Sequence, residues 1–194
     1  LQVPATALQA PGATTASALG HLPGLMATQL GGAGSLTQIY VRGANPNQLR
    51  IYLDDFPMER ADGAPIDLSE LPLYSATGIT IWRNHTPIGY GGGIGGALRL
   101  GLPQTRDTHF RGTGEVGSFG TARLALQGGY RSQDGGWGGQ VAVGLLRSRG
   151  DYGWMDDGGT LLETDDDRPR SRENNDVTRL SAVVTASGDV RGCT

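Results

Sequence analysis

The sequence lacks several features of helical, disulfide-bonded or nucleic-acid-binding proteins. Its one cysteine, Cys193, can build neither an intrachain disulfide nor a thiolate metal site. It has 3 Trp and 3 Phe against 33 Gly, which is too much glycine for a helical bundle and favours tight turns between strands. No apolar run approaches the roughly 18–20 residues of a membrane-spanning helix. The formal net charge is -3, without a basic stripe, and this excludes nucleic acid as an expected partner.

Motifs for catalysis and cofactor binding are missing or fail in their context. The glycine cluster Gly91–Gly96 formally fits a dinucleotide fingerprint, but the next residues alternate like a short strand where that fingerprint requires a helix. We predict tight backbone packing there instead. Asp54 and Asp55 are neighbours on a strand, so their side chains should point to opposite faces, which favours a turn over acid–base or metal chemistry. We expect no enzyme, no cofactor and no metal site.

The N-terminal half alternates short apolar runs with polar turns. Residues 1–12 have no period and predict an extended lead-in. Thr14 or Thr15 should cap one short helix that ends at Pro23 and Gly24. Two strands joined by a polar tip at 44–48 should follow. The full set of expected elements comprises the helix, strands at 36–43, 49–57, 78–84 and 97–100, and a short helix at 68–74.

The sequence pattern changes near Asp107, where we place a domain boundary. Beyond it, the runs of alternating apolar and polar residues become longer and more regular. The expected strands cover 110–117, 121–131, 138–149 and 177–186, with a short turn at 132–136 and a long acidic loop at 151–175. Apolar and polar residues fall on opposite faces: Leu124, Leu126 and Tyr130 against Gln127, and Val141, Val143 and Leu145 against Gln140 and Gly144. A soluble β-rich binding or adhesion protein, with its strands packed as a sandwich, is one architecture that fits.

Five segments carry a more specific resemblance. IYVRG, LRIYLDDFP, DLSELP, GITIWRN and YGGGIGGALRL occur in the order and spacing found in the plug of TonB-dependent outer-membrane receptors, and the likeness covers residues 18–100. Several blocks in register are far more specific than one glycine motif. The sequence departs from the family pattern at Asp55 and Asn84, where glycine is usual, and at Gly78 and Thr80, where glutamate is common.

The resemblance implies an α+β plug domain over 1–107, followed over 108–194 by antiparallel β-strands of an incomplete 22-stranded outer-membrane β-barrel. It also implies a receptor that takes up a metal chelate, with a ferric siderophore preferred, or a vitamin. The plug would gate the barrel, with the TonB energy-transducing protein in the periplasm and outer-membrane lipid as partners. Strands of about ten residues tilted near 45° span roughly 25 Å, enough to cross an outer membrane. Four strands cannot close a barrel, so we expect the chain alone not to transport.

The resemblance also suggests site residues. Ligand contacts are expected from three outward tips at 29–38, 44–48 and 56–67, and the preferred side chains are Asn45, Asn47, Gln48, Glu59 and Arg60. The alternative is that these are ordinary solvated turns. Arg42 and Arg83 match two arginines that in family members pair with barrel glutamates and hold the plug. Arginine suits such a lock because its fork binds two carboxylate oxygens and stays charged when partly buried.

Overall fold

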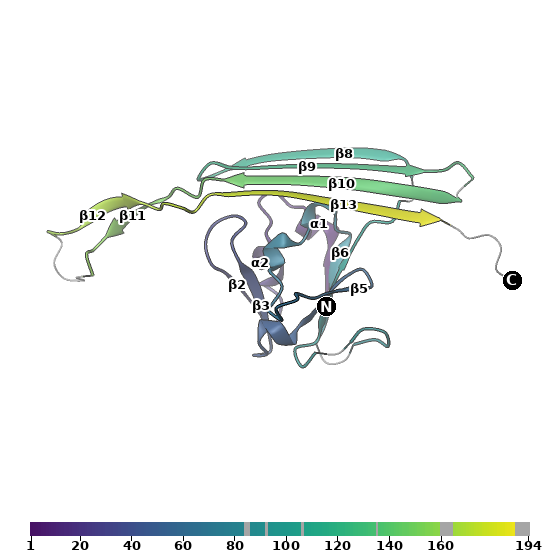
Figure 1. Cartoon of the computed structure of the whole chain (residues 1–194), viewed down its shortest axis with the longest axis horizontal. Coiled ribbons are helices and arrows are strands. Elements are labelled where there is room, and N and C mark those ends of the chain that lie inside the picture. The colour runs from purple at the N-terminus through teal and green to yellow at the C-terminus, as the bar shows by residue number, and fades with distance from the viewer. Residues whose placement is uncertain (84–85, 92, 106, 135, 160–164, 189–194) are drawn as a thin grey trace.

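The computed structural model describes residues 1–83, 86–91, 93–105, 107–134, 136–159 and 165–188. An N-terminal α+β unit (residues 1–101) packs beneath one face of a long antiparallel sheet, which we call the wall sheet (Figure 1). A two-stranded ribbon projects beyond one end of the wall sheet. Asn84, Gly92 and Cys193, which entered the sequence argument, lie outside the described residues.

The N-terminal unit is built on a five-stranded sheet with the strand order β1-β6-β7-β4-β5. Its strands are β1 (Gln2–Pro4), β4 (Arg50–Leu53), β5 (Phe56–Met58), β6 (Gly78–Trp82) and β7 (Ala97–Gly101). Only the β4–β7 pair is parallel. A separate hairpin joins β2 (Leu25–Gln29) to β3 (Thr37–Val41). The helices are α1 (Ala5–Leu8) and α2 (Thr15–Leu19), with 3₁₀ turns η1 (Pro46–Gln48), η2 (Leu68–Glu70) and η3 (Leu73–Ser75).

One hydrophobic core holds this unit together, and alternation along the short strands explains it. In β6, Ile79 and Ile81 point inward while their neighbours are half-exposed, and β7 adds Leu98 and Leu100. Leu19 of α2 is fully buried against the same core. The predicted cap of α2 is confirmed: the hydroxyl of Thr14 accepts the backbone N–H of Ser17 at 3.1 Å, and the hydroxyl of Ser17 accepts that of Thr14 at 2.9 Å.

The glycine cluster and the aspartate pair have the roles that the sequence suggests. A Cβ at Gly93 would lie 2.0 Å from the carbonyl oxygen of Gln48, so only glycine fits this close backbone approach. Asp54 occupies the turn between β4 and β5 with a positive φ of 50°. Its carboxylate accepts the backbone N–H of Leu102 at 2.9 Å and pairs with Arg99 at 3.3 Å. Gly93 therefore has the predicted packing role and Asp54 the predicted turn role.

Several expectations for this half are wrong. Residues 1–12 are not a plain extended lead-in, because they contain β1 and α1. The strand β1 pairs with β6, which lies far along the sequence. The strand β2 was not expected at all, and α2 ends at Leu19, before Pro23. The two strands expected on either side of the 44–48 tip are present, but they belong to different sheets: β3 pairs with β2, whereas β4 pairs with β5 and β7. The 3₁₀ turns η2 and η3 stand where one short helix was expected.

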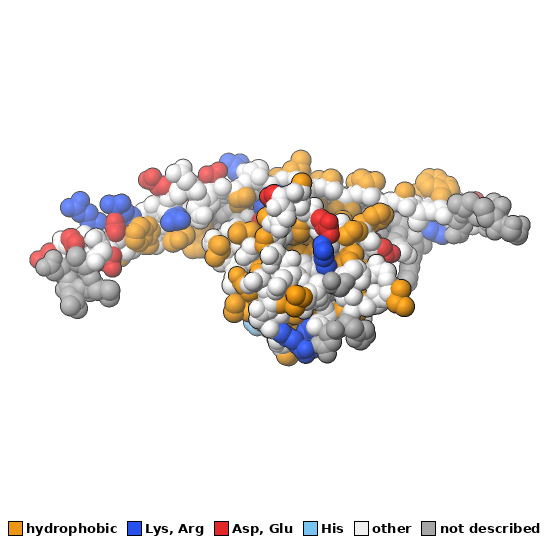
Figure 2. All heavy atoms as spheres, turned by 60° about the horizontal axis from the view of Figure 1, so that its bottom comes forward, with side chains coloured by type: hydrophobic (Ala, Val, Ile, Leu, Met, Phe, Trp, Pro, Cys, Tyr) orange, Lys and Arg blue, Asp and Glu red, His pale blue; other side chains and the backbone are white. Residues whose placement is uncertain are grey.

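The wall sheet follows the sequence prediction closely. Its strands are β8 (His109–Gly117), β9 (Thr121–Arg131), β10 (Trp137–Ser148) and β13 (Val177–Gly188), in the order β13-β10-β9-β8. All three pairings are antiparallel, and the strands are 9 to 12 residues long. The segment 151–175, expected as one long acidic loop, contains the ribbon of β11 (Gly153–Asp156) and β12 (Arg168–Ser171). Figure 2 shows charged side chains gathered at this ribbon end.

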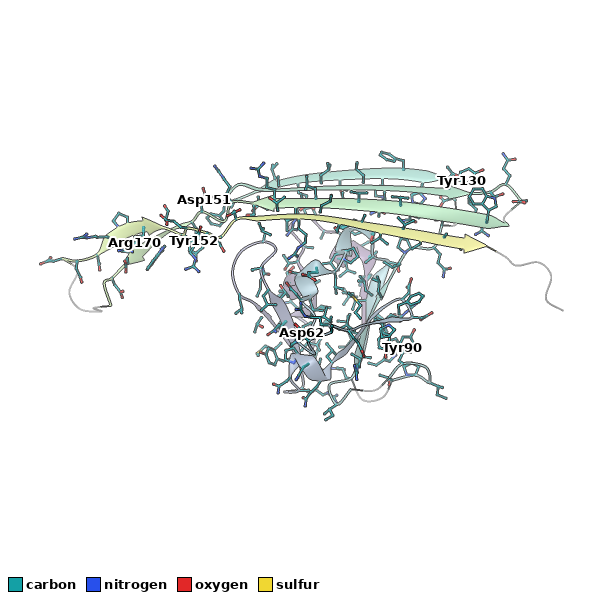
Figure 3. All side chains as sticks on the ribbon, in the orientation of Figure 1. Asp62, Tyr90, Tyr130, Asp151, Tyr152 and Arg170 are labelled. Carbon is teal, nitrogen blue, oxygen red and sulfur yellow. The ribbon has the colours of Figure 1, made fainter. Side chains whose placement is uncertain are left out.

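The two faces of the wall sheet differ as predicted. The outer face, away from the N-terminal unit, exposes large apolar side chains: Phe110, Val116, Leu124, Leu126, Val141, Val143, Leu145, Leu180 and Val184. Aromatic pairs mark its two ends: the rings of Tyr130 and Trp137 lie 5.2 Å apart, and those of Phe119 and Tyr152 lie 6.0 Å apart (Figure 3). No second sheet covers this face within the described residues, so the sandwich alternative does not describe the fold. An apolar band between aromatic ends is typical of strands that face lipid.

Candidate functional site

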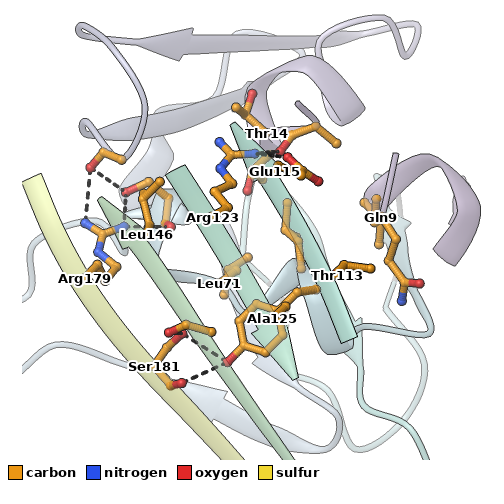
Figure 4. A pocket seen from close by; sticks show the side chains of 18 of the residues that line it. Gln9, Thr14, Leu71, Thr113, Glu115, Arg123, Ala125, Leu146, Arg179 and Ser181 are labelled. Carbon is orange, nitrogen blue, oxygen red and sulfur yellow. Dashed lines mark hydrogen bonds and ion pairs between the residues drawn. The ribbon is translucent and has the colours of Figure 1, made fainter. Parts of the chain in front are cut away.

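The N-terminal unit meets the inner face of the wall sheet along an interface that we call the seam (Figure 4). The seam encloses a cavity of about 160 Å³. From the N-terminal unit the cavity is lined by residues of α1, the α2 cap and the η2–η3 segment, and from the wall by residues of all four strands. Polar side chains from both sides, such as Gln9, Glu115 and Gln127, face it. A cavity of this size with polar partners can hold ordered water.

Tyr74, in η3, is the central contact of the seam. Its ring lies over Gly144 of β10, where an added Cβ would come within 2.4 Å of the ring atom Cε1. The hydroxyl of Tyr74 lies 3.2 Å from the carbonyl oxygen of Ser181 and 3.0 Å from its hydroxyl. The side-chain amide of Gln127 donates to the backbone carbonyl of Tyr74. A glycine on the wall thus makes room for an aromatic ring that reaches two neighbouring strands.

Two wall arginines point inward and donate to backbone carbonyls of the N-terminal unit. Arg179 reaches the carbonyl oxygen of Ser69 at 2.8 Å and that of Gly34 at 3.2 Å. Arg123 reaches the carbonyl oxygen of Ala13 at 2.9 Å and lies 3.8 Å from Glu115 on the neighbouring strand. A hydrogen bond from a charged donor contributes about 1.5–3 kcal/mol. The seam therefore includes charge-assisted hydrogen bonds from two wall arginines beside the Tyr74 contact.

The residues predicted to touch ligand lie mostly on exposed turns. Asn45 and Asn47 are exposed, and the side chain of Gln48 folds back to accept the backbone N–H of Asn45 at 3.0 Å. Because β4 and β5 are antiparallel, the start of β4 and the end of β5 meet at one edge. There Glu59 pairs with Arg50 at 2.5 Å. The structure thus brings the 44–48 tip and Glu59 to the same end of this hairpin.

Arg60 forms a local pair with Asp62. Its guanidinium donates to both carboxylate oxygens, at 3.0 and 2.8 Å. This hydrogen bond, with that from the backbone N–H of Ala64, lowers the pKa of Asp62 to about 2, while the pKa of Arg60 is raised by the same partner. Both side chains are about half-exposed, so the pair shapes the loop without a large energetic contribution.

The two arginines of the expected lock lie close together at the far ends of β3 and β6. Arg42 follows β3 with a positive φ of 52°, and both side chains flank Gly24. A Cβ at Gly24 would lie 3.3 Å from a guanidinium nitrogen of Arg83 and 3.6 Å from Cγ of Arg42. The guanidinium of Arg83 donates to the carbonyl oxygen of Pro23 at 2.5 Å. Pairing of these arginines with barrel glutamates stays a prediction.

An aromatic cluster covers the other side of the β4–β7–β6 sheet. Tyr90, from the glycine-rich segment, packs edge-on against Tyr52 with ring centroids 4.8 Å apart and lies 5.0 Å from Trp82. Its hydroxyl donates to the carboxylate of Asp55, and this bond raises the pKa of Tyr90. Figure 3 places Tyr90 well away from the wall sheet. The cluster fastens the glycine-rich segment onto the sheet.

The sequence did not reveal the seam residues Tyr74, Arg123 and Arg179. Alternation does place Arg123 on the same face as Gln127, and Arg179 on the same face as Ser181, so an inward position could have been predicted. Their acceptors could not, because backbone carbonyls leave no mark in a sequence. Within the described residues no helix is both long and apolar enough to cross a membrane. The same residues contain no group of His, Cys, Asp or Glu side chains that could hold a metal ion.

Comparison with known proteins identifies the N-terminal unit. Residues 2–97 match the family model described as TonB-dependent Receptor Plug Domain. The curated relatives include the vitamin B12 transporter BtuB of several Vibrio cholerae serotype O1 strains, which is 31% identical over 83 residues, or 42% of this chain. The chain spans only 14% of the length of these relatives.

Solved structures extend the likeness beyond the N-terminal unit. The copper transporter OprC superposes with a TM-score of 0.62 at 17% identity, covering 76% of this chain and 24% of OprC. The siderophore receptor PirA from Acinetobacter baumannii superposes with a TM-score of 0.59 at 13% identity, and the match covers 77% of this chain and 24% of PirA. The ferric citrate transporter FecA superposes with a TM-score of 0.57 at 19% identity, and the match covers 78% of this chain and 28% of FecA. Residues 2–97 therefore belong to the plug-domain family of TonB-dependent receptors, and the chain as a whole has the fold of such a plug with adjoining antiparallel strands.

Proposed function

We propose that this protein is a TonB-dependent importer in which the plug gates the barrel and a metal chelate, preferably a ferric siderophore, is the cargo. One observation carries the proposal: the plug packs against the inner face of a sheet whose outer face is apolar and ends in aromatic pairs. Such a sheet suits a lipid boundary, with the plug filling the lumen. Passage then requires movement of the plug, for which the TonB protein of the periplasm would supply the force. The plug and wall residues named above have binding and packing roles, and we propose no enzymatic activity.

Vitamin B12 is the second candidate cargo. It is favoured by the 31% identity to the BtuB transporters, which falls within 83 residues of this chain. The solved structures that resemble the chain include receptors for several chelates and a copper transporter; all are below 25% identity, so they support the fold alone and do not choose between the cargoes. Selectivity in such a receptor would come from the plug tips together with barrel loops. An uptake experiment decides between the two cargoes.

Uptake by the full-length receptor tests the proposal. The receptor would be expressed in a bacterium that lacks its own siderophore and cobalamin receptors, with and without functional TonB. We expect TonB-dependent accumulation of radiolabelled iron supplied as a ferric siderophore panel. Accumulation of labelled cyanocobalamin alone would select the vitamin. If neither cargo accumulates above the receptor-free strain, the proposed importer function is wrong.

For the ligand contacts we propose Asn45, Asn47, Gln48, Glu59 and Arg60, which are polar side chains at or near one end of the β4–β5 hairpin. Replacing Asn47 and Arg60 by alanine should weaken binding of the transported cargo about tenfold or more, because each change removes a hydrogen-bonding group. Arg147→Ala, which changes an exposed arginine on the outer face of β10, is the matched control. Unchanged affinity in the double variant would remove this assignment.

A further inference from the structure

Arg179 joins the wall to two separate plug segments at once. One guanidinium nitrogen donates to the carbonyl oxygen and to the hydroxyl of Ser69, at 2.8 and 2.9 Å. The other donates to the carbonyl oxygen of Gly34 at 3.2 Å. Figure 4 shows the guanidinium between these acceptors. The Arg179 bonds to the plug therefore link the loop between β2 and β3 to the η2 turn.

The loop at 30–36 is internally braced, so it moves as one piece. The side-chain amide of Gln29 donates to the carbonyl oxygen of Gly32 at 2.7 Å, and the hydroxyl of Ser35 donates to the same oxygen at 2.6 Å. The backbone N–H of Leu30 donates to the carbonyl oxygen of Leu36 at 3.0 Å. A restraint at one point of such a loop is passed to its tip.

The wall holds the same loop by packing. Gly34 has a φ of 78°, and a Cβ placed there would lie 2.9 Å from Leu146 and 3.2 Å from Val177. A Cβ at Gly31 would lie 3.9 Å from the side-chain oxygen of Asn175, whose amide nitrogen donates to the carbonyl oxygen of Gly150 at 3.1 Å. The loop thus sits where β13 emerges from the segment that carries the ribbon.

The second plug segment is tied back to the first. The carboxylate of Asp67 accepts the backbone N–H of Thr37 and that of Ser69, each at 2.9 Å. Asp67 also ends the 56–67 segment, one of the three tips expected to meet ligand. Through Ser69 and Gly34, Arg179 therefore restrains two of these three tips, although it belongs to neither.

We propose that Arg179 is a positioning residue for ligand binding: it fixes the 30–36 loop and the Ser69 turn against the wall and so sets the geometry of two ligand-contacting tips. This rests on the proposed importer function. Without the arginine, ligand would have to order the loop at a cost in affinity. Lysine would keep the charge but lose the fork that reaches both acceptors, so it should restore the function only in part.

The test uses the full-length receptor with Arg179→Gln, Arg179→Lys and the control Arg111→Gln. Arg111 also points from the wall toward the plug, but its bond is a 3.4 Å contact to the side chain of Gln9. Amide hydrogen exchange should rise about tenfold at 30–36 and 67–71 in Arg179→Gln, with β6 and β7 unchanged. The affinity for a ferric siderophore or cyanocobalamin, whichever the wild type binds, should fall about tenfold. The exchange rates and ligand affinity of Arg179→Lys should lie between those of the wild type and of Arg179→Gln, and those of the Arg111→Gln control should match the wild type.

Ser69→Ala adds a double-mutant comparison. If the Ser69 hydroxyl and Arg179 act together, Ser69→Ala should reduce ligand affinity less in the Arg179→Gln background than in the wild type. The inference is overturned if exchange at 30–36 does not change. It is also overturned if protection falls equally throughout the plug, or if affinity falls no more than in the Arg111 control. If the wild type binds neither probe, the importer proposal fails, while hydrogen exchange still decides whether Arg179 restrains the loop.

Discussion

Gly144→Ala is the sharpest single test of the seam. The added Cβ would lie 2.4 Å from Cε1 and 2.8 Å from Cζ of Tyr74, distances that no real contact tolerates. The ring would have to withdraw, which would also stretch its 3.2 Å bond to the carbonyl oxygen of Ser181. Overpacking of this kind costs about 1–3 kcal/mol. If the cost falls on plug docking, the population of undocked plug should rise roughly 5-fold to 160-fold.

The assay is protease cleavage and amide hydrogen exchange of the plug in the full-length receptor. Gly139→Ala is the matched control, because it makes the same change in the same strand and its Cβ would meet only the carbonyl oxygen of Thr185 at 3.5 Å, an ordinary contact. Adding Tyr74→Leu to Gly144→Ala should return part of the protection by making room. Equal behaviour of the Gly144 and Gly139 variants would refute the seam geometry.

Three further outcomes follow from the structure. Replacing Arg42 and Arg83 by alanine should loosen the plug and speed its cleavage by protease if the two pair with barrel glutamates as the family resemblance implies, since breaking such a pair, where the barrel buries it, costs about 3–5 kcal/mol; unaltered protection would count against the lock. Arg60→Ala should raise the pKa of Asp62 from about 2 toward its usual value of about 3.9. An NMR pH titration of the Asp62 carboxyl carbon measures this pKa. Because the folded pKa is lowered, the Arg60–Asp62 bond contributes above the usual pKa and is lost as pH falls through about 2; a pKa that does not move would be the contrary result. Gln140→Leu should leave thermal stability unchanged or higher, because Gln140 is buried with no partner for its amide atoms among the described residues, and a clear loss would show that water satisfies them.

The wall strands could be predicted because their signal is local. Most residues of β9 and β10 alternate between an apolar outer face and a small or polar inner face, so the period alone predicts both the strands and their facing. The expected β9 range coincides with the observed one. The likeness of five short motifs to the plug family carried the rest, since no single motif in the N-terminal half has enough length to show a period. Together they predicted the fold class.

Long-range pairing could not be predicted in this way. β1 has 3 residues and finds its partner in Ile79 and its neighbours, far along the chain, so nothing near Val3 announces a strand. Burial shows what the short segment contributes: Val3 and Leu8 enter the core at 5% and 2% exposure. Edge strands of this length gain stability mainly from tertiary packing, which local propensity does not measure.

The candidate site divides along the same line. The tips at 44–48 and 59–60 could be predicted as exposed polar turns because their residue types prefer turns. The grip of Arg123 and Arg179 on the plug could not, since its acceptors are backbone carbonyls of Ala13, Gly34 and Ser69. Neutral acceptors also matter physically. When such a bond parts, water from the adjoining cavity of about 160 Å³ can replace either partner, so neither the guanidinium nor the carbonyl is left without a hydrogen bond. If plug arginines do pair with barrel carboxylates, parting that lock would separate two opposite charges, so the wall seam should part at a lower cost than such a lock.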